Sequence, residues 1–175
     1  KITGGILFDL GASYHQLTKQ ERGFSFSKEA PLDMRFNMDS NFSAYDVVND
    51  YSEDELVKIF SEYGEERFSK RIAKKIVEQR KIKKLETTTE LADLIVNCTP
   101  KVKSHIHPAT RVFQAIRIEV NHELQNVKNT LNDVLDLLDF GAIISVISFH
   151  SLEDRLVKQT FKYYSTRCHC ERNQM

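Results

Sequence analysis

Hydrophobic residues in this chain form two short uninterrupted runs, separated by long stretches with helical spacing. The runs at residues 5–10 and 142–149 are predicted to be strands buried on both faces, because parallel strands covered on both sides read as continuous apolar segments. Polar residues stand where each run ends, Asp9 at the first and His150-Ser151 at the second. Ligands of open parallel sheets bind at the carboxyl ends of the strands, so these residues are predicted to share one site.

Between and after the strands, apolar residues recur at steps of three and four, the spacing of amphipathic helices. Residues 43–82 are predicted to hold several helices, and one begins at Ser52 because Glu55 completes a capping box. One long helix is predicted from Pro108 to a stop at Gly141. Shorter helices are predicted at residues 89–97 and 152–163.

This order of elements predicts half of an α/β sheet that carries a helical insertion. We assign residues 1–40 and 109–165 to the sheet domain, 41–108 to the insertion and 166–175 to a C-terminal segment. Residues 12–41 contain few periodic apolar positions but several aromatic ones, which favours an ordered functional loop. Two strands rarely make a stable sheet alone, so we expect the sequence to be part of a longer protein.

Composition narrows the class of protein. The 175 residues carry 25 basic and 25 acidic side chains, 41% of the residues are hydrophobic and 29% are charged, which is typical of a soluble globular domain. No run of about 18 apolar residues occurs, so no membrane span is expected. Three cysteines do not suit a secreted disulfide framework, and we expect a reducing compartment.

A local basic face breaks this neutral average. Residues 65–84 contain nine basic and three acidic side chains, a net charge of +6. Such a face suits contacts with phosphates, and we single out Arg71, Lys74 and Lys75 as candidates. The alternative is a solvated face of an amphipathic helix, with Phe68, Ile72 and Ile76 forming its buried side.

Other candidate sites are weaker. Asp9 is either an active-site acceptor or a helix cap. Cys168 and Cys170 are too close in sequence for the usual paired zinc ligands, and His105 and His107 are a similarly weak metal signal. A hydrolytic triad of His150, Ser151 and Asp154 is disfavoured because no glycine elbow surrounds the serine. The alternative role of Ser151 is to cap the helix that begins near residue 152, with Asp154 at its third position.

Six separated segments together resemble one family, the S-adenosylmethionine-dependent small-subunit rRNA cytosine-N4 methyltransferases (the RsmH or MraW family). Their order and approximate spacing also match, from residue 1 to about 165. The segments are DLGASYHQL at residues 9–17, ERGFSF at 21–26, PLDMR at 31–35, YGEERF at 63–68, HPATRVFQAIRI at 107–118 and SFHSLEDR at 148–155.

The resemblance implies a Rossmann-like class I methyltransferase sheet, partial here, with an inserted all-helical subdomain that recognises the substrate. It implies methyl transfer from S-adenosyl-L-methionine to the exocyclic amine of a cytidine in the decoding region of the small ribosomal subunit. Asp9 and Gln16 occupy the positions with which the family binds its methyl donor. The family's first strand and glycine-rich loop would precede Lys1, and its C-terminal strand pair would follow the chain.

The resemblance also suggests roles around the acceptor base, and the reaction requires no metal. We expect Ser13, His150 and Ser151 to lie near the reacting amine. An unstacked cytosine could be held by planar side chains such as Arg22 and Phe24. Further RNA contacts are expected from the motif residues Asp33, Arg35, His107 and Arg111.

Departures from the family pattern keep a second hypothesis open. Tyr14-His15, Ala30 and Phe140-Gly141 replace the usual residues, so the alternative is a divergent, catalytically silent member that acts as an RNA-binding assembly factor of the small subunit. Either hypothesis implies small-subunit rRNA as partner and no membrane, and leaves a homodimer open. The expected location is the cytoplasm of a bacterium, or the mitochondrial matrix of a eukaryote.

Overall fold

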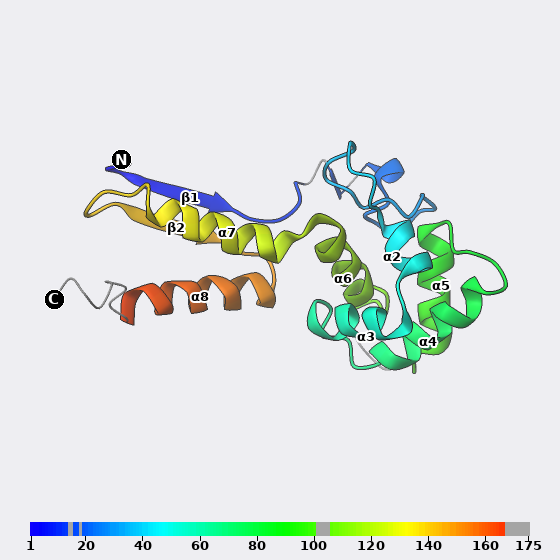
Figure 1. The fold of residues 1–175 in the computed structure, drawn as a ribbon. Helices are drawn as coiled ribbons and strands as arrows, with labels where there is room; N and C mark the ends of the chain where they lie inside the picture. The colour runs from blue at the N-terminus through cyan, green and yellow to red at the C-terminus, as the bar shows by residue number, and fades with distance from the viewer. Residues whose placement is uncertain (14–15, 18, 101–105, 167–175) are drawn as a thin grey trace. The chain divides into compact units, whose positions relative to one another are not determined.

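The computed structural model describes residues 1–13, 16–17, 19–100 and 106–166. These residues form two compact units, one made of Lys1–Gly11 with Glu123–Met175 and the other of Ala12–His122. The chain is a mixed α/β protein with a small parallel sheet (Figure 1). None of the helices in the described part of the chain is long and apolar enough to cross a membrane.

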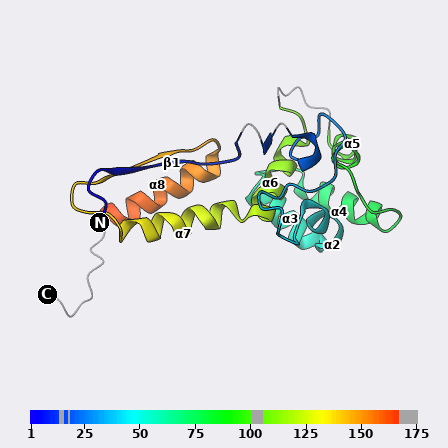
Figure 2. The same cartoon turned by 90° about the horizontal axis from the view of Figure 1, so that it is seen from above.

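The first unit, here called the sheet unit, contains both predicted strands. Strand β1 (Gly5–Asp9) pairs in parallel with β2 (Ile143–Ile147), in a register that sets Gly5 opposite Ile143 and Asp9 opposite Ile147. Helices α7 (Glu123–Leu135) and α8 (Ser151–Thr166) lie side by side along the strand pair, as both views show (Figures 1 and 2). The prediction that the two apolar runs share one parallel sheet is confirmed.

Only one face of this sheet is covered. Exposure alternates along both strands, and the open face carries large apolar side chains, with Leu7 65% and Ile143 66% exposed. The described residues therefore bury one face of each strand, and burial of the second face stays a prediction. The pair of helices α7 and α8 covers one face of the sheet. The strands nevertheless have the continuous apolar pattern of strands that are covered on both faces.

The second unit, here called the helical unit, is built from short helices. They are η1 (Gln20–Arg22), α2 (Ala44–Asp50), α3 (Glu53–Glu62), α4 (Ser69–Arg80), α5 (Thr88–Cys98) and α6 (Thr110–Asn121). Capping boxes begin three of them, at Ser43, Ser52 and Thr87, and the one at Ser52 was predicted. Each box satisfies backbone N–H groups that the first turn leaves without partners.

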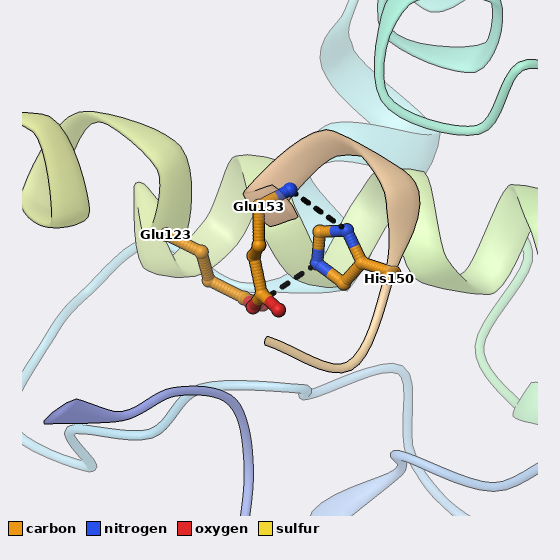
Figure 3. A group of neighbouring side chains, drawn as sticks. All are labelled: Glu123, His150 and Glu153. Atoms are coloured by element: carbon orange, nitrogen blue, oxygen red, sulfur yellow. Dashed lines mark hydrogen bonds and ion pairs between the residues drawn. The ribbon is translucent and has the colours of Figure 1, made fainter. Parts of the chain in front are cut away.

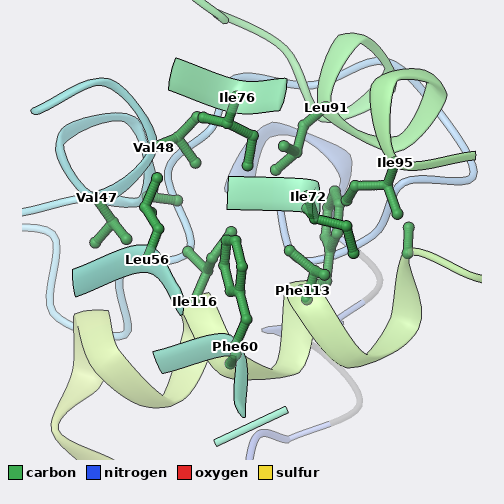
Figure 4. Close-up of a cluster of buried hydrophobic side chains, with 14 of the residues drawn as sticks. Val47, Val48, Leu56, Phe60, Ile72, Ile76, Leu91, Ile95, Phe113 and Ile116 are labelled. Carbon is green, nitrogen blue, oxygen red and sulfur yellow. The ribbon is translucent and has the colours of Figure 1, made fainter. Parts of the chain in front are cut away.

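The core of the helical unit is a single cluster of aliphatic and aromatic side chains (Figure 4). Leu56, Phe60, Ile72 and Ile116 are fully buried, and they come from α3, α4 and α6. Ile76 is also fully buried, as the predicted stripe on α4 requires. Full burial of one large apolar side chain stabilises the folded state by about 1.5–3 kcal/mol.

The long connection after β1 packs onto these helices. Pro31 forms a β-bridge with Thr87, and Leu32 and Met34 are buried in the helical core. The compact units therefore divide after residues 11 and 122, whereas we expected divisions after residues 40 and 108. The amino-terminal boundary differs because Leu32 and Met34, which lie in a segment without helical periodicity, are buried in the core of the helical unit.

The single long helix expected from Pro108 to Gly141 is wrong. His122 adopts a left-handed conformation (φ 49°) and its N–H donates to carbonyls of α6, so one helix ends at Asn121 and the next begins at Glu123. Histidine is among the few residues other than glycine that adopt this conformation with some frequency. The apolar spacing continues across the break, which is why periodicity alone does not reveal it.

Candidate active site

The carboxyl ends of the two strands meet at one edge of the sheet, as predicted. Asp9 and Ile147 are the last paired residues, and Leu10 N–H donates to the Ile147 carbonyl at 3.1 Å. Asp9 is exposed, and its carboxylate has no hydrogen bond or ion pair with any residue in the described ranges. A free carboxylate at this edge is able to accept hydrogen bonds from a ligand, which suits the donor role that the family resemblance implies.

Two residues extend this edge beyond the paired strands. Gly11 has φ +90°, and a Cβ built there would lie 3.4 Å from Cδ2 of Phe149. The Phe149 side chain is 69% exposed, although its backbone N–H donates to Oε2 of Glu153 at 2.9 Å. No role was expected of Phe149, although an aromatic residue shortly after a predicted strand is a signal for a residue at the sheet edge.

Behind this edge lies a buried cluster of Glu123, His150 and Glu153, here called the Glu–His–Glu cluster (Figure 3). One polar atom from each residue lies within 4.8 Å of the other two. Nδ1 of His150 accepts a long hydrogen bond (3.4 Å) from Glu153 N–H, while Nε2 lies 3.2 Å from Oε1 of Glu153. Glu123 begins α7 and Glu153 lies in the first turn of α8, so both carboxylates are also favoured by a helix N-terminus.

The electrostatics of this cluster favour an ionised Glu153. Burial raises the pKa of Glu153, but contact with His150 and the hydrogen bond from Phe149 N–H outweigh burial and hold that pKa below its ordinary value. Two carboxylates and an imidazole could in principle hold a metal ion. In this structure both ring nitrogens of His150 are directed at Glu153, Nδ1 at its backbone N–H and Nε2 at its carboxylate. The cluster joins the first turns of α7 and α8 to the residues that follow β2.

His150 also takes the capping role that we expected of Ser151. Helix α8 begins at Ser151, and the residue before it, His150, accepts the N–H of Glu153 through its side chain. The expected cap by Ser151 is thus a correction by one residue. His150 turns its ring toward the two carboxylates (Figure 3), whereas Ser151 is exposed.

Ser13 and Gln16 belong to the helical unit and bond to each other. Ser13 N–H donates to Oε1 of Gln16 at 2.9 Å, and Gln16 N–H donates to Oγ of Ser13 at 3.3 Å. This reciprocal pair has the form of a capping box. It fixes the side chains of Ser13 and Gln16 relative to each other.

The motif residues between Arg22 and Arg35 mainly hold one loop in shape. Nη2 of Arg22 donates to the carbonyls of Arg35 and Phe36, and Arg22 lies over the ring of Phe24, 5.9 Å from its centroid. Phe24 in turn stacks on Phe36 with ring centroids 5.4 Å apart. Asp33 accepts two hydrogen bonds from the guanidinium of Arg35, at 3.0 and 2.7 Å. Burial raises the pKa of Asp33, but the bonds from Arg35 lower it by more, so the pair stays ionised.

Asn121, which the sequence analysis did not identify, fixes this loop to α6. Its Oδ1 accepts Phe36 N–H at 2.6 Å, and its Nδ2 donates to the Met34 carbonyl at 2.8 Å. Met34 is buried and has a φ of 58°, a left-handed conformation that a nonglycine residue adopts at a cost. The strained turn is therefore held by an amide that is 85 residues or more away in sequence.

The remaining RNA candidates are distributed over the helical unit. The His107 ring stacks on Phe26 with centroids 4.6 Å apart, and its Nδ1 accepts Ala109 N–H at 3.2 Å. Arg111 is exposed and donates to the Glu65 carbonyl at 2.9 Å. These contacts give His107 and Arg111 local structural roles.

The basic face of α4 is exposed, as predicted. Arg71, Lys74 and Lys75 all face solvent, while Ile72 and Ile76 on the same helix are buried. Phe68, at the start of the helix, is partly buried against the core. A pocket of about 390 Å³ lies where α4 and α5 meet, and Lys75 is among its lining residues.

The cysteines add no reactive group in the described residues. Cys98 is buried, and burial raises the pKa of its thiol, which disfavours the thiolate. Cys168 and Cys170, the weak zinc candidates, and His105 lie outside the described residues.

Comparisons with known proteins decide the family. A family model described as the MraW methylase family matches residues 1–174. The chain belongs to the MraW methylase family. The resemblance drawn from the six sequence segments is thereby confirmed.

Curated relatives of this MraW methylase chain share one name, ribosomal RNA small subunit methyltransferase H. The relative from Caldicellulosiruptor bescii is 58% identical over 169 residues, which is 97% of this chain and 55% of that protein. The relative from Clostridioides difficile is 54% identical over 169 residues, covering 95% of this chain and 54% of the relative. The relative from Persephonella marina is 56% identical over 164 residues, covering 93% and 56%. The chain thus spans about half the length of the curated relatives it matches.

Proposed function

We propose that this protein methylates N4 of a cytidine in small-subunit ribosomal RNA, in the decoding region, with S-adenosyl-L-methionine as donor. The observation that carries the proposal is identity above 50% along nearly the whole chain to relatives named ribosomal RNA small subunit methyltransferase H. Asp9 at the carboxyl edge of a parallel sheet supports it independently, because donors of this kind bind at such edges.

We assign the β1–β2 sheet to a Rossmann-like methyltransferase domain and residues 41–108 to an inserted substrate-recognition subdomain. The compact helical unit of residues 12–122 interrupts the sheet unit in sequence and contains residues 41–108, which supports an insertion, although its bounds are wider than those of our assignment. In this arrangement the sheet edge carries the chemistry, and the helices contact the RNA.

Asp9 and Gln16 are the residues we assign to the methyl donor. The exposed Asp9 carboxylate, free of other partners in the described residues, fits hydrogen-bonding groups of S-adenosylmethionine. Gln16 already uses Oε1 to accept Ser13 N–H, which leaves its amide N–H groups as donors toward a ligand. The donor supplies an electrophilic methyl group on a sulfonium, and no metal is required for its transfer.

The acceptor is the harder half of the reaction, because the lone pair of the cytosine amine is delocalised into the ring. A hydrogen bond from that amine to the Ser13 hydroxyl or to the backbone carbonyl of Leu10 would draw the lone pair out of conjugation. Positioning of the two reactants then supplies much of the remaining rate enhancement. We assign Ser13 to this role, and we place Ser151 close to the base. His150, whose ring nitrogens both face Glu153, acts by holding the strand end in position.

RNA contacts fall to the helical unit. We assign phosphate contacts to Arg71, Lys74 and Lys75, whose exposure on α4 supports them. The loop that we propose to face the nucleotide is shaped by Arg22, Phe24, Asp33 and Arg35. We also assign RNA contacts to His107 and Arg111, which belong to the matching segment of residues 107–118.

The second candidate function is a catalytically silent assembly factor that binds the small subunit. The departures at Tyr14-His15, Ala30 and Phe140 favour it, while the high identity to named methyltransferases opposes it. In both cases the proposed partner is the small ribosomal subunit, the proposed location is the bacterial cytoplasm, and a homodimer is compatible with either.

The test is incubation of the complete protein with small subunits from cells that lack the enzyme and with donor labelled in its methyl group. The rRNA is then digested to nucleosides and separated. We expect label in N4-methylcytidine. Donor binding and subunit binding without label in that nucleoside would establish the assembly factor instead.

A further inference from the structure

Phe149 and Asp9 lie on the same open face of the sheet, at the same edge. Exposure alternates along β2, and Phe149 continues the exposed series that includes Ile147, two residues earlier. Asp9 is paired with Ile147 and is exposed in the same alternation along β1. An exposed aromatic ring therefore lies close to Gly11, two residues after the aspartate that we assign to the methyl donor.

Phe149 differs from the other exposed apolar residues of this face. Leu7 and Ile143 lie within the paired strands, where a second layer of a sheet protein would cover them. Phe149 lies beyond the last pair of the ladder, where the strands end and ligands of open sheets bind. On the β1 side the ring approaches Gly11, which has no side chain.

The backbone that carries this ring is unusually well fixed for an exposed residue. Phe149 N–H donates to Glu153, and Glu153 is 1% exposed. Glu153 in turn contacts His150 and lies beside Glu123 in the Glu–His–Glu cluster, which joins the starts of α7 and α8 (Figure 3). A buried network thus fixes the backbone of an apolar ring that faces solvent. Such a ring is suited to contact a ligand that has an apolar face.

A cytosine that is methylated on its exocyclic amine must leave its base stack, and its exposed π-face then needs a partner. Aromatic side chains supply such partners in proteins that bind single-stranded RNA. Phe24 is less suited, because its ring already stacks on Phe36. We propose that the ring of Phe149 is the surface on which the acceptor cytosine stacks, and that the Glu–His–Glu cluster positions this ring. The inference rests on the proposed function and names the residue that holds its substrate base.

The experiment compares Phe149→Ala and Phe149→Tyr in the complete protein, with Phe140→Ala as matched control. Phe140 is a fully exposed phenylalanine in the same unit, before β2 instead of after it. Loss of one aromatic–base stack lowers kcat/KM for small subunits by about fivefold to a hundredfold in Phe149→Ala. Phe149→Tyr keeps a stacking face and should stay near the parent, and all three variants should bind S-adenosylmethionine with the parent's affinity.

A binding assay without turnover separates stacking from packing. These 175 residues contain no tryptophan, so Phe149→Trp adds a fluorophore to this part of the protein. The emission that Phe149→Trp adds to the parent signal should be quenched by a cytidine-containing oligonucleotide, whereas the emission that Phe140→Trp adds should not. In the Phe149→Trp background, Glu153→Gln retains an acceptor for the backbone N–H and should preserve the quenching. Glu153→Leu removes that acceptor and should weaken it.

The outcomes separate the two claims. If the parent transfers no methyl group, the proposed function fails and this inference fails with it. If the parent is active and Phe149→Ala retains kcat/KM, the inference alone is wrong. Equal defects in Phe149→Ala and Phe149→Tyr, together with weakened donor binding, would show that Phe149 is a packing residue.

Discussion

Replacement of Asn121 by alanine tests whether a single amide holds the loop of residues 31–36 in its strained form. The change removes two hydrogen bonds to the loop, Phe36 N–H to Oδ1 at 2.6 Å and Nδ2 to the Met34 carbonyl at 2.8 Å. Both loop groups are partly buried, so each bond is worth about 0.5–1.5 kcal/mol and the pair about 1–3 kcal/mol. Met34, with its φ of 58°, gains freedom to relax once the clamp is gone.

Amide hydrogen exchange measures this effect at the loop itself. Exchange of the Phe36 amide should accelerate by about tenfold to a hundredfold in Asn121→Ala, since 1.4 kcal/mol corresponds to a factor of ten. Trypsin should also cleave after Arg35 more rapidly in the folded variant.

Asn49→Ala is the matched control. Asn49 is a buried amide of the same unit that bonds to both backbone groups of Leu85, at 2.8 and 3.0 Å, and does not touch the loop. It should lower the free energy of unfolding at least as much and leave exchange at Phe36 near the parent rate. Unchanged exchange at Phe36 in Asn121→Ala, or equal acceleration in both variants, would refute the claim that the Asn121 amide holds the loop of residues 31–36.

Three further predictions address the core, the Glu–His–Glu cluster and the basic face. Phe60→Ala removes a fully buried ring and should cost about 3–5 kcal/mol in urea unfolding; a loss below 1 kcal/mol would contradict the described core. The pKa of Glu153 is depressed, so its stabilising contribution is complete above the ordinary glutamate pKa of about 4.3 and is lost as pH falls through the lower folded-state value. The difference in unfolding free energy between parent and Glu153→Gln should therefore shrink in that acidic range, and a constant difference from pH 3 to 6 would show that ionisation is irrelevant. Neutralising Arg71, Lys74 and Lys75 should reduce the salt slope of subunit binding by about two to three without a change in stability, whereas an unaltered slope would make them an ordinary solvated face.

Local patterns predicted the elements whose signals are local. The capping box at Ser52 and the helix expected at residues 89–97, observed as Thr88–Cys98, follow from short-range hydrogen bonding and periodicity. The parallel pairing of residues 5–10 with 142–149 also followed, because two apolar strands that are joined through helices have few other ways to pair.

Other features depend on contacts that sequence spacing does not contain. The helix break at His122 leaves the apolar period intact, so periodicity alone does not show where α6 ends. The clamp by Asn121 joins residues 85 or more positions apart, and no local rule pairs them. Phe149 ends an apolar run and was therefore predicted to be a buried strand residue. The structure shows that the strand pairing ends at Ile147 and that Phe149 is exposed.

Methyl transfer at the carboxyl edge of the β1–β2 sheet is tested most directly by single-turnover transfer from labelled S-adenosylmethionine to small subunits, with Asp9→Ala in the complete protein. Asp139→Ala is the control, because Asp139 is an exposed aspartate of the same unit on the other side of β2 in sequence. Loss of charge-assisted hydrogen bonds to the donor should weaken its binding by about 1.5–3 kcal/mol and slow formation of N4-methylcytidine at subsaturating donor, and the control should match the parent. Unchanged donor affinity and rate in Asp9→Ala, with the parent active, would place the reaction elsewhere on the protein.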